Sequence, residues 1–244
     1  MTPPSFHKFR RIYCGNCGHH FDVPVPCSNR FCNVCNVRRR ARVHSKLSKM
    51  LDALPTPPGY SWKHLTLSTS NPQNLRAGVK SLIHSFRKLR QTCLWKDFVN
   101  SGAFVIEITH SAAGYHPHIH AIILSKFFPW YKLQRQWRRC SSGTSVYIQR
   151  IPRKAVINYL TKYITKSSMP LPFQEDAADS LKGIRLVQFF GKAHNLVNIP
   201  SPEPYLCPEC NSTCWLVNID PIFLVEISQK QKPLVTIRSP EVKV

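Results

Sequence analysis

The chain has 244 residues and carries 34 Lys and Arg against 12 Asp and Glu, a formal net charge of +22. So large a positive excess predicts a polyanionic partner, most simply DNA or RNA. The sequence contains no run of about eighteen apolar residues, which disfavours a membrane span. Its N-terminal segment also lacks the apolar core of a signal peptide. We therefore expect a cytoplasmic protein rather than a membrane or secreted one.

Six of the ten cysteines form three Cys-x-x-Cys pairs. Pairs at this spacing donate two thiolates each to a tetrahedral structural zinc ion, and a reducing compartment disfavours disulfides. We expect the first two pairs to share an ion, with Cys27 as an alternative or second-site ligand. The third pair, near Cys214, could instead complete a site with the first pair or with Cys27, so the sharing stays open. The predicted zinc ligands are Cys14, Cys17, Cys27, Cys32, Cys35, Cys207 and Cys210.

A basic cluster follows the second cysteine pair and suits contacts with phosphate groups. It begins a predicted helix whose apolar face runs from Val43 to Leu54, and Pro55–Gly59 then marks a plausible domain boundary. The cluster that we expect to bind DNA consists of Arg38, Arg39, Arg40 and Arg42.

The pattern of apolar residues then predicts strand, helix, two strands, helix, strand and helix, followed by a loop at residues 167–172. This order fits an α+β domain in which helices pack on one face of an antiparallel sheet. The elements are expected at residues 62–68, about 74–94, 104–109, 116–124, 129–139, 145–150 and 159–166.

Three histidines alternate along the fourth of these elements. With the period of two that a strand has, His116, His118 and His120 lie on one face. Neutral imidazole is among the commonest ligands of divalent metal ions, and Glu107 would add a carboxylate if the two strands pair as a hairpin. A single strand histidine is usually a half-buried polar residue, but three at alternate positions favour a metal site.

The last predicted helix carries two tyrosines and two lysines at helical spacing. Tyr159 and Tyr163 share a face, as do Lys162 and Lys166. Alone, the tyrosines would be interpreted as part of a buried apolar stripe. Together with the histidines, they complete the parts of a phosphodiester transesterification, namely a metal, a phenol nucleophile and a lysine that stabilises charge.

These segments resemble the HUH endonucleases, and specifically the rolling-circle replication initiators (Rep proteins) of small plasmids and phages. His118-Ile-His120 is similar to their metal pair, with Glu107 or His116 as third ligand. The resemblance implies a ferredoxin-like nuclease domain with both histidines on a central strand. Where many plasmid members have a Glu four residues before the catalytic Tyr, this chain has Tyr159, as in two-tyrosine initiators. The segments that carry the resemblance are 27–38, 64–69, 107–109, 115–121 and 159–166.

The resemblance implies strand-specific nicking and rejoining of single-stranded DNA at a replication origin, through a 5′-phosphotyrosine, with Mg²⁺ or Mn²⁺ bound. A host helicase and polymerase would be further partners. The expected domains are a zinc-knuckle region at 1–58, the nuclease at 59–199 and a C-terminal segment at 200–244. Two alternatives stay open: a single-strand DNA transposase with the same chemistry, and a non-catalytic zinc-dependent DNA-binding regulator.

Overall fold

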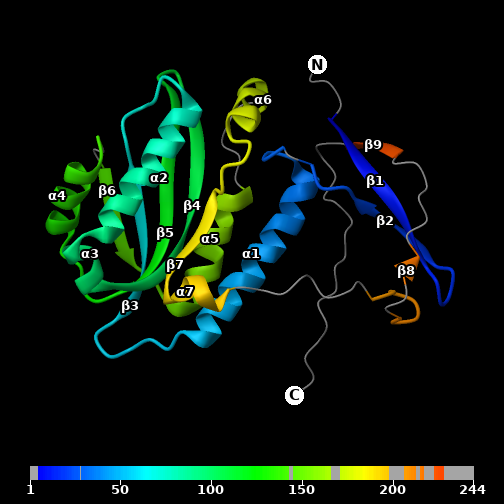
Figure 1. Ribbon diagram of the computed structural model, residues 1–244, viewed down its shortest axis with the longest axis horizontal. Helices are drawn as coiled ribbons and strands as arrows, with labels where there is room; N and C mark the ends of the chain where they lie inside the picture. Colours follow the sequence, from blue (N-terminus) through cyan, green and yellow to red (C-terminus); the bar gives the residue numbers. More distant parts are fainter. Residues whose placement is uncertain are drawn as a thin grey trace. The chain divides into compact units, whose positions relative to one another are not determined.

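The structure is a computed structural model that describes residues 5–27, 29–142, 145–165, 171–197, 206–212, 215–216 and 223–227. The chain divides into two compact units, one formed by residues 1–27 with 203–244 and the other by residues 28–202. Figure 1 shows the ribbon of both. Within the described ranges, no helix has both the length and the apolar character needed to cross a bilayer.

The larger unit is built on an antiparallel sheet of five strands in the order β6-β3-β5-β4-β7, so β5 lies at its centre (Figure 1). Helices flank this sheet, which confirms the predicted α+β class. The predicted strands are all present, and β7 is an additional one. The strands are β3 (Ser61–Ser68), β4 (Val99–Ser111), β5 (Gly114–Ser125), β6 (Ser145–Arg150) and β7 (Val187–Gly191).

The hairpin of β4 and β5 is the longest pairing in this sheet. Its register places Glu107 opposite His118 and Ile106 opposite Ile119. The reversal ends at Gly114, whose φ of +94° lies in the region that residues with a side chain seldom adopt. The expected hairpin is therefore present, and it brings the carboxylate strand beside the histidine strand.

The predicted helices are all present, but one of them is divided, another begins earlier than expected, and α7 was not expected. The predicted helix at about 74–94 is in fact two helices, because the Thr92 hydroxyl donates to the Leu89 carbonyl of the first and accepts from the Trp95 amide of the second. The first helix begins before the basic cluster, with Cys32 as its N-cap, and α6 was not expected. The helices are α1 (Asn33–Ala53), α2 (Leu75–Gln91), α3 (Cys93–Phe98), α4 (Trp130–Cys140), α5 (Val156–Thr165), α6 (Leu171–Ser180) and α7 (Lys192–Leu196), with a 3-10 turn at Arg153–Ala155.

Helices cover both faces of the sheet, so the expectation of one covered face was wrong. On one face Ile119 and Ile123 of β5 pack with residues of α2 and α4. On the other face Ile122 and Leu124 pack with residues of α1 and α5. The physical reason is the unbroken apolar run at residues 121–124, which places apolar side chains on both faces of the strand.

Helix α1 groups with the larger unit, although the sequence analysis assigned it to the N-terminal region. Its buried Leu47 and Met50 lie in one core with Val156 and Leu160 of α5. The Pro-rich segment 55–59 is a connection from α1 to β3 rather than a separation between compact units. The predicted domain ranges stay predictions, while the compact units follow a different division of the chain.

The smaller unit joins segments from near both ends of the chain in one sheet. Strand β1 (Ser5–Cys14) pairs antiparallel with β2 (His20–Pro24), β8 (Trp215–Leu216) and β9 (Phe223–Ile227). An ion pair between Arg11 and Asp22, 2.9 Å long, links β1 to β2 on the exposed side.

Candidate active site

The centre of the site is a carboxylate paired with an imidazole on neighbouring strands. Glu107 of β4 and His120 of β5 point from the same face of the sheet, and the His120 Nε2–Oε2 Glu107 distance is 2.8 Å. Both residues are buried, with relative exposures of 6 % and 7 %. A buried carboxylate without a hydrogen-bonded partner would lower the stability of the folded protein. The hydrogen bond to His120 offsets the cost of burying Glu107.

The other ring nitrogen of His120 is held by β3. His120 Nδ1 lies 3.2 Å from Thr66 Oγ1 and 3.4 Å from His64 Nε2. Contacts at both nitrogens fix the orientation of the ring. The burial of His64 and the nearby positive charges lower its pKa to about 4, so His64 is neutral at neutral pH.

His118 and His116 occupy the same strand face but make different contacts. The ring centroids of His118 and His120 are 6.3 Å apart, and His118 Nε2 lies 3.5 Å from the Thr109 hydroxyl. Burial lowers the pKa of His118, which keeps its imidazole in the neutral form that binds metals. His116 instead contacts the Ser111 hydroxyl at the hairpin turn, away from Glu107.

Helix α5 carries the tyrosines across this face. The ring of Tyr163 stacks on that of His120, with centroids 3.6 Å apart and an interplanar angle of 4°. Tyr159 lies beside His64, at a centroid distance of 5.4 Å. Burial and then the negative charge of Glu107 raise the pKa of Tyr163, so this residue is a neutral phenol at neutral pH.

The predicted basic residues are spread around the site. Lys162 Nζ lies 5.8 Å from the centroid of the Tyr163 ring, which is cation–π distance. Lys166 falls outside the described residues. Within the arginine cluster, all of which lies on α1, Arg40 and Arg42 are exposed and Arg38 and Arg39 are half-buried.

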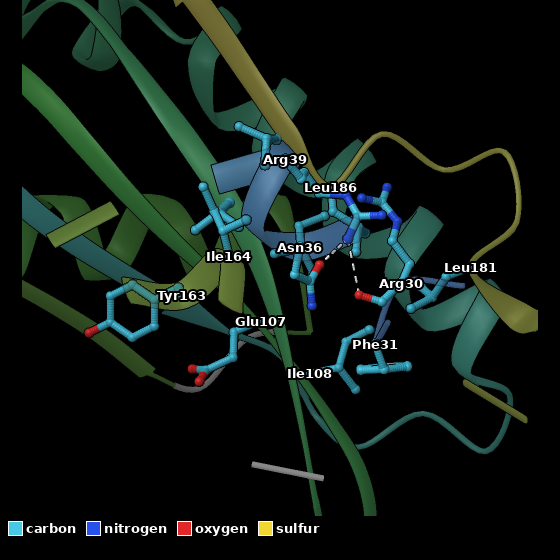
Figure 2. Close-up of a pocket in the computed structure, with 13 residues that line it drawn as sticks. Arg30, Phe31, Asn36, Arg39, Glu107, Ile108, Tyr163, Ile164, Leu181 and Leu186 are labelled. Atoms are coloured by element: carbon cyan, nitrogen blue, oxygen red, sulfur yellow. Dashed lines mark hydrogen bonds between the residues drawn. The ribbon is translucent and has the colours of Figure 1, made fainter. Parts of the chain in front are cut away.

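A small pocket opens beside the nucleophile candidate, shown in Figure 2. Tyr163 and Glu107 line one side of it, and Arg30 and Arg39 line another. Its volume is about 50 Å³, and apolar side chains complete the wall. The pocket extends the site from the sheet toward the start of α1.

The donor set fits a divalent ion in its chemistry. One carboxylate and two neutral imidazoles are a common ligand set for such ions. Among the described residues, however, the donor atoms of Glu107, His118 and His120 do not all lie within 4.8 Å of one another. Glu107 and His120 are hydrogen-bonded to each other here, and with His118 they are the residues that would hold an ion.

Four cysteines of the smaller unit form a compact cluster. The Sγ atoms of Cys14, Cys17, Cys207 and Cys210 all lie within 4.8 Å of one another. The Cys14–Cys210 and Cys17–Cys207 Sγ distances are both 3.6 Å. A zinc ion with bonds of about 2.3 Å requires tetrahedron edges of about 3.8 Å. The cluster can therefore hold a zinc ion, and the first pair meets the third pair rather than the second.

One of these thiols is already biased toward the thiolate. The Asn16 side-chain amide donates to Cys210 Sγ at 3.5 Å, and this hydrogen bond is the main cause that lowers the pKa of Cys210 to about 6. In the second pair, Cys32 Sγ accepts from the Cys35 amide at 3.5 Å at the start of α1. Cys214 lies outside the described residues.

Comparison with known proteins identifies the family. A family model described as replication protein, Rep_1, matches residues 20–198. The chain belongs to this family of replication proteins. It is also 30 % identical over 124 residues to Protein rep of Streptococcus pneumoniae serotype 2, a match that covers 46 % of this chain and 39 % of that relative. The chain thus spans less than half the length of this relative. No solved structure matches the chain significantly.

This membership confirms the predicted resemblance to Rep proteins. Residues 20–198, which match the family model, include both active-site strands and α5. The cluster of Cys14, Cys17, Cys207 and Cys210 lies wholly outside this range. Sequence reasoning missed His64 and Thr66. Their alternation on the strand at 62–68 was a usable signal, but the pairing of that strand with the histidine strand was not predicted.

Proposed function

We propose that this replication protein nicks and rejoins one strand of DNA at a specific site by tyrosine transesterification, and so initiates rolling-circle replication of a plasmid or phage. The observation that carries the proposal is the stacking of the Tyr163 ring on His120, which is itself hydrogen-bonded to Glu107. A phenol nucleophile beside a carboxylate and imidazoles is the combination that metal-assisted attack on a phosphate requires.

Tyr163 is the first nucleophile in this proposal. Its hydroxyl oxygen attacks the scissile phosphorus, forms a 5′-phosphotyrosine and displaces the 3′-oxygen, which takes up a proton and leaves as a 3′-hydroxyl. One phosphodiester bond breaks as another forms, so rejoining needs no nucleotide cofactor. Because the pKa of Tyr163 is raised, the phenol must lose its proton during the attack.

Glu107, His118 and His120 would hold Mg²⁺ or Mn²⁺, with His116 left at the hairpin turn. When bound, such an ion supplies Lewis-acid polarisation of the scissile phosphate. Thr66 and His64 orient the His120 ring through its second nitrogen. Lys162, close to the Tyr163 ring, and Lys166 would add positive charge near the phosphate.

Tyr159 would act in the second step. It lies one helical turn before Tyr163 on the same face of α5 and beside His64, so both phenols reach the same region of the sheet. Alternating attack by two tyrosines would allow the protein to cut again at termination and transfer the strand. Arg38, Arg39, Arg40 and Arg42 on α1 would contact the origin DNA.

The test is incubation with a labelled single-stranded oligonucleotide that carries a candidate origin, with and without Mn²⁺. We expect metal-dependent cleavage and label bound covalently to the protein, both lost in Tyr163→Phe. Tyr131→Phe is the matched control, because Tyr131 is exposed on α4, which packs on the opposite face of the sheet.

Tight binding without any covalent adduct, across several candidate origins, would contradict the proposal and favour a DNA-binding regulator. If the adduct forms but the preferred substrates are terminal repeats rather than an origin hairpin, the chemistry stands and the biological role is that of a transposase. A Tyr159→Phe variant that loses the first cleavage while Tyr163→Phe retains it would reverse the order of the two tyrosines.

Zinc binding at the cysteine cluster completes the proposal. The Sγ distances support one structural Zn²⁺ shared by Cys14, Cys17, Cys207 and Cys210. We expect Cys207→Ser to lower the zinc content by one ion per chain and to abolish the thiolate–cobalt absorption of the Co²⁺-loaded protein. Cys93→Ser, which changes an exposed cysteine on α3, is the matched control. A second ion that survives Cys207→Ser would show that a further group in the chain binds metal.

A further inference from the structure

The pocket beside Tyr163 contains two arginines: the nicking proposal gives Arg30 no role and Arg39 only a general contact with the origin DNA. Arg30 precedes α1 and Arg39 lies on it, and Figure 2 shows their guanidinium groups near each other across the pocket from Tyr163 and Glu107. Arg39 Nη1 donates to the Arg30 carbonyl at 3.1 Å and also to the Asn36 side chain. Arg30 donates to the Ile184 carbonyl. Both side chains are therefore held in place by neutral acceptors.

Neither arginine has an acidic partner among the described residues. The ion pairs there join other groups, and Glu107, which lines the same pocket, pairs with His120 instead. Burial, and then repulsion from Arg39, lower the pKa of Arg30 to about 10, so this guanidinium is charged at neutral pH. Two like charges held together in a half-buried position are unfavourable alone and become favourable when an anion joins them.

The remaining wall of the pocket is apolar. Phe31, Ile108, Leu181 and Leu186 line it, and three of these are buried in the core of the larger unit. Because three of these side chains are at most 9 % exposed and the pocket volume is about 50 Å³, the pocket has room for a phosphate group but not for a base or a sugar.

We propose that this pocket binds a backbone phosphate of the DNA strand next to the scissile phosphate, on Arg39 and Arg30. The inference rests on the proposed nicking function, because Tyr163 and Glu107 line the same pocket. Binding a neighbouring phosphate positions the strand, and therefore selects which phosphate meets Tyr163.

The test measures binding rather than cleavage, in full-length protein carrying Tyr163→Phe. Oligonucleotides in which one phosphate at a time is replaced by an uncharged methylphosphonate are titrated by fluorescence anisotropy. We expect one position next to the scissile phosphate to lose about tenfold in affinity, as for a charge-assisted hydrogen bond. The Arg39→Gln variant should bind the native oligonucleotide about tenfold more weakly than the parent protein does. Its affinity for the oligonucleotide substituted at that position should show no further loss.

Arg87→Gln, an exposed arginine of α2 on the opposite face, is the control and should leave the position-specific loss unchanged. Arg39→Lys keeps the charge and should retain part of the coupling, so the inference stays testable if the Gln variant is unstable. Arg39→Gln should also reduce the dependence of log affinity on log salt by about 0.7, as expected for one lost contact to a single strand.

Two results separate this inference from the proposed function. If Arg39→Gln weakens every oligonucleotide equally, as Arg87→Gln would, the pocket holds no defined phosphate, and the inference is wrong even when nicking occurs. If the position-specific coupling is present but the unaltered protein forms no covalent adduct, the pocket binds a phosphate and the nicking proposal fails.

Discussion

The two faces of the central sheet are built from the same strands but differ in what they bury. On the face covered by α2 and α4, here called the packing face, β5 contributes Ile119, Ala121 and Ile123 to a continuous apolar core. On the face covered by α1 and α5, the site face, it contributes apolar residues in one half and histidines in the other. Because side chains alternate along β5, one residue packs in the apolar core and the next faces the site.

Helix α5 shows how the site face combines both roles. Leu160 is fully buried in the apolar half, and Tyr163, three residues later on the same side of the helix, stacks on His120. The packing of Leu160 therefore fixes the position of Tyr163. The comparison teaches that substitutions on the packing face should change stability alone, whereas those at the polar half of the site face should change activity alone.

Glu107→Gln should give the largest effect. The amide keeps the shape and can still accept from His120, so we expect the free energy of unfolding to change by less than about 1 kcal/mol. Nicking should fall by about a thousandfold, about 4 kcal/mol, because metal-assisted charge stabilisation is worth several kcal/mol. Single-turnover cleavage and thermal melting measure the two effects. Glu175→Gln, at an exposed position of α6, should change neither; an equal loss there would break the comparison.

Phe86→Ala tests the packing face. Phe86 is fully buried and makes edge-to-face contacts with Trp95 and Phe104, at centroid distances of 5.5 and 5.0 Å. We expect a loss of about 3–4 kcal/mol in urea unfolding, with nicking per folded molecule unchanged. Phe127→Ala removes the same group from a side chain that is 78 % exposed and should cost less than about 0.5 kcal/mol. A change in nicking rate per folded molecule would show that the faces are coupled.

Much of the fold was predictable because strand periodicity and turn residues are local signals. The pairing of Glu107 with the histidine strand followed from a Gly-terminated turn between two apolar segments. The break at Thr92 was missed because apolar spacing continues through it, and only the side-chain hydrogen bonds of Thr92 separate α2 from α3. The two-sided cover was missed although the unbroken apolar run at residues 121–124 indicated it.

The site was less predictable where it depends on residues that are distant in sequence. His64 contacts His120 only because β3 pairs with β5 in one register. The meeting of Cys14 with Cys210 depends on a sheet formed from near both ends of the chain, and equal Cys-x-x-Cys spacings cannot distinguish partners. Arg30 lies in the Cys-rich segment 27–38, but no pattern in the sequence singles it out, and only the structure places it beside Arg39 and Tyr163.

Thr66→Val sharpens the comparison within the site face. Valine has nearly the same shape, but it loses the hydroxyl that lies 3.2 Å from His120 Nδ1. We expect the apparent affinity for Mn²⁺ to fall about 10- to 100-fold, as for other groups that orient a metal ligand. The nicking rate at saturating Mn²⁺ should be largely restored, which distinguishes a positioning residue from a catalytic one. Thr69→Val, just beyond β3, is the control; a lower rate at saturation with unchanged affinity would contradict the positioning role.

The smallest effect concerns a charge on the packing side of β3. Lys63 precedes His64, so its side chain lies on the opposite face of β3, where it is buried. Its Nζ donates to the Ser125 carbonyl and the Lys126 carbonyl, each at 2.9 Å. Burial, and then the charge of Arg150, lower its pKa to about 8 in the folded protein, against about 10.5 in the unfolded chain. Between these values the unfolded chain binds more protons than the folded one.

The stability that Lys63 contributes should therefore rise with pH through this window. From pH 7.5 to 9.5 we expect the unfolding free energy of the unaltered protein to gain about 1–2 kcal/mol relative to Lys63→Met, which has no amine to titrate. Urea unfolding of both proteins at several pH values measures the difference. Lys96→Met, at an exposed position of α3, should show no such gain. If the difference in unfolding free energy between the two proteins does not change with pH, the four hydrogen-bond acceptors of Lys63 stabilise its ammonium form enough to offset burial. A charge would then be tolerated on the packing face.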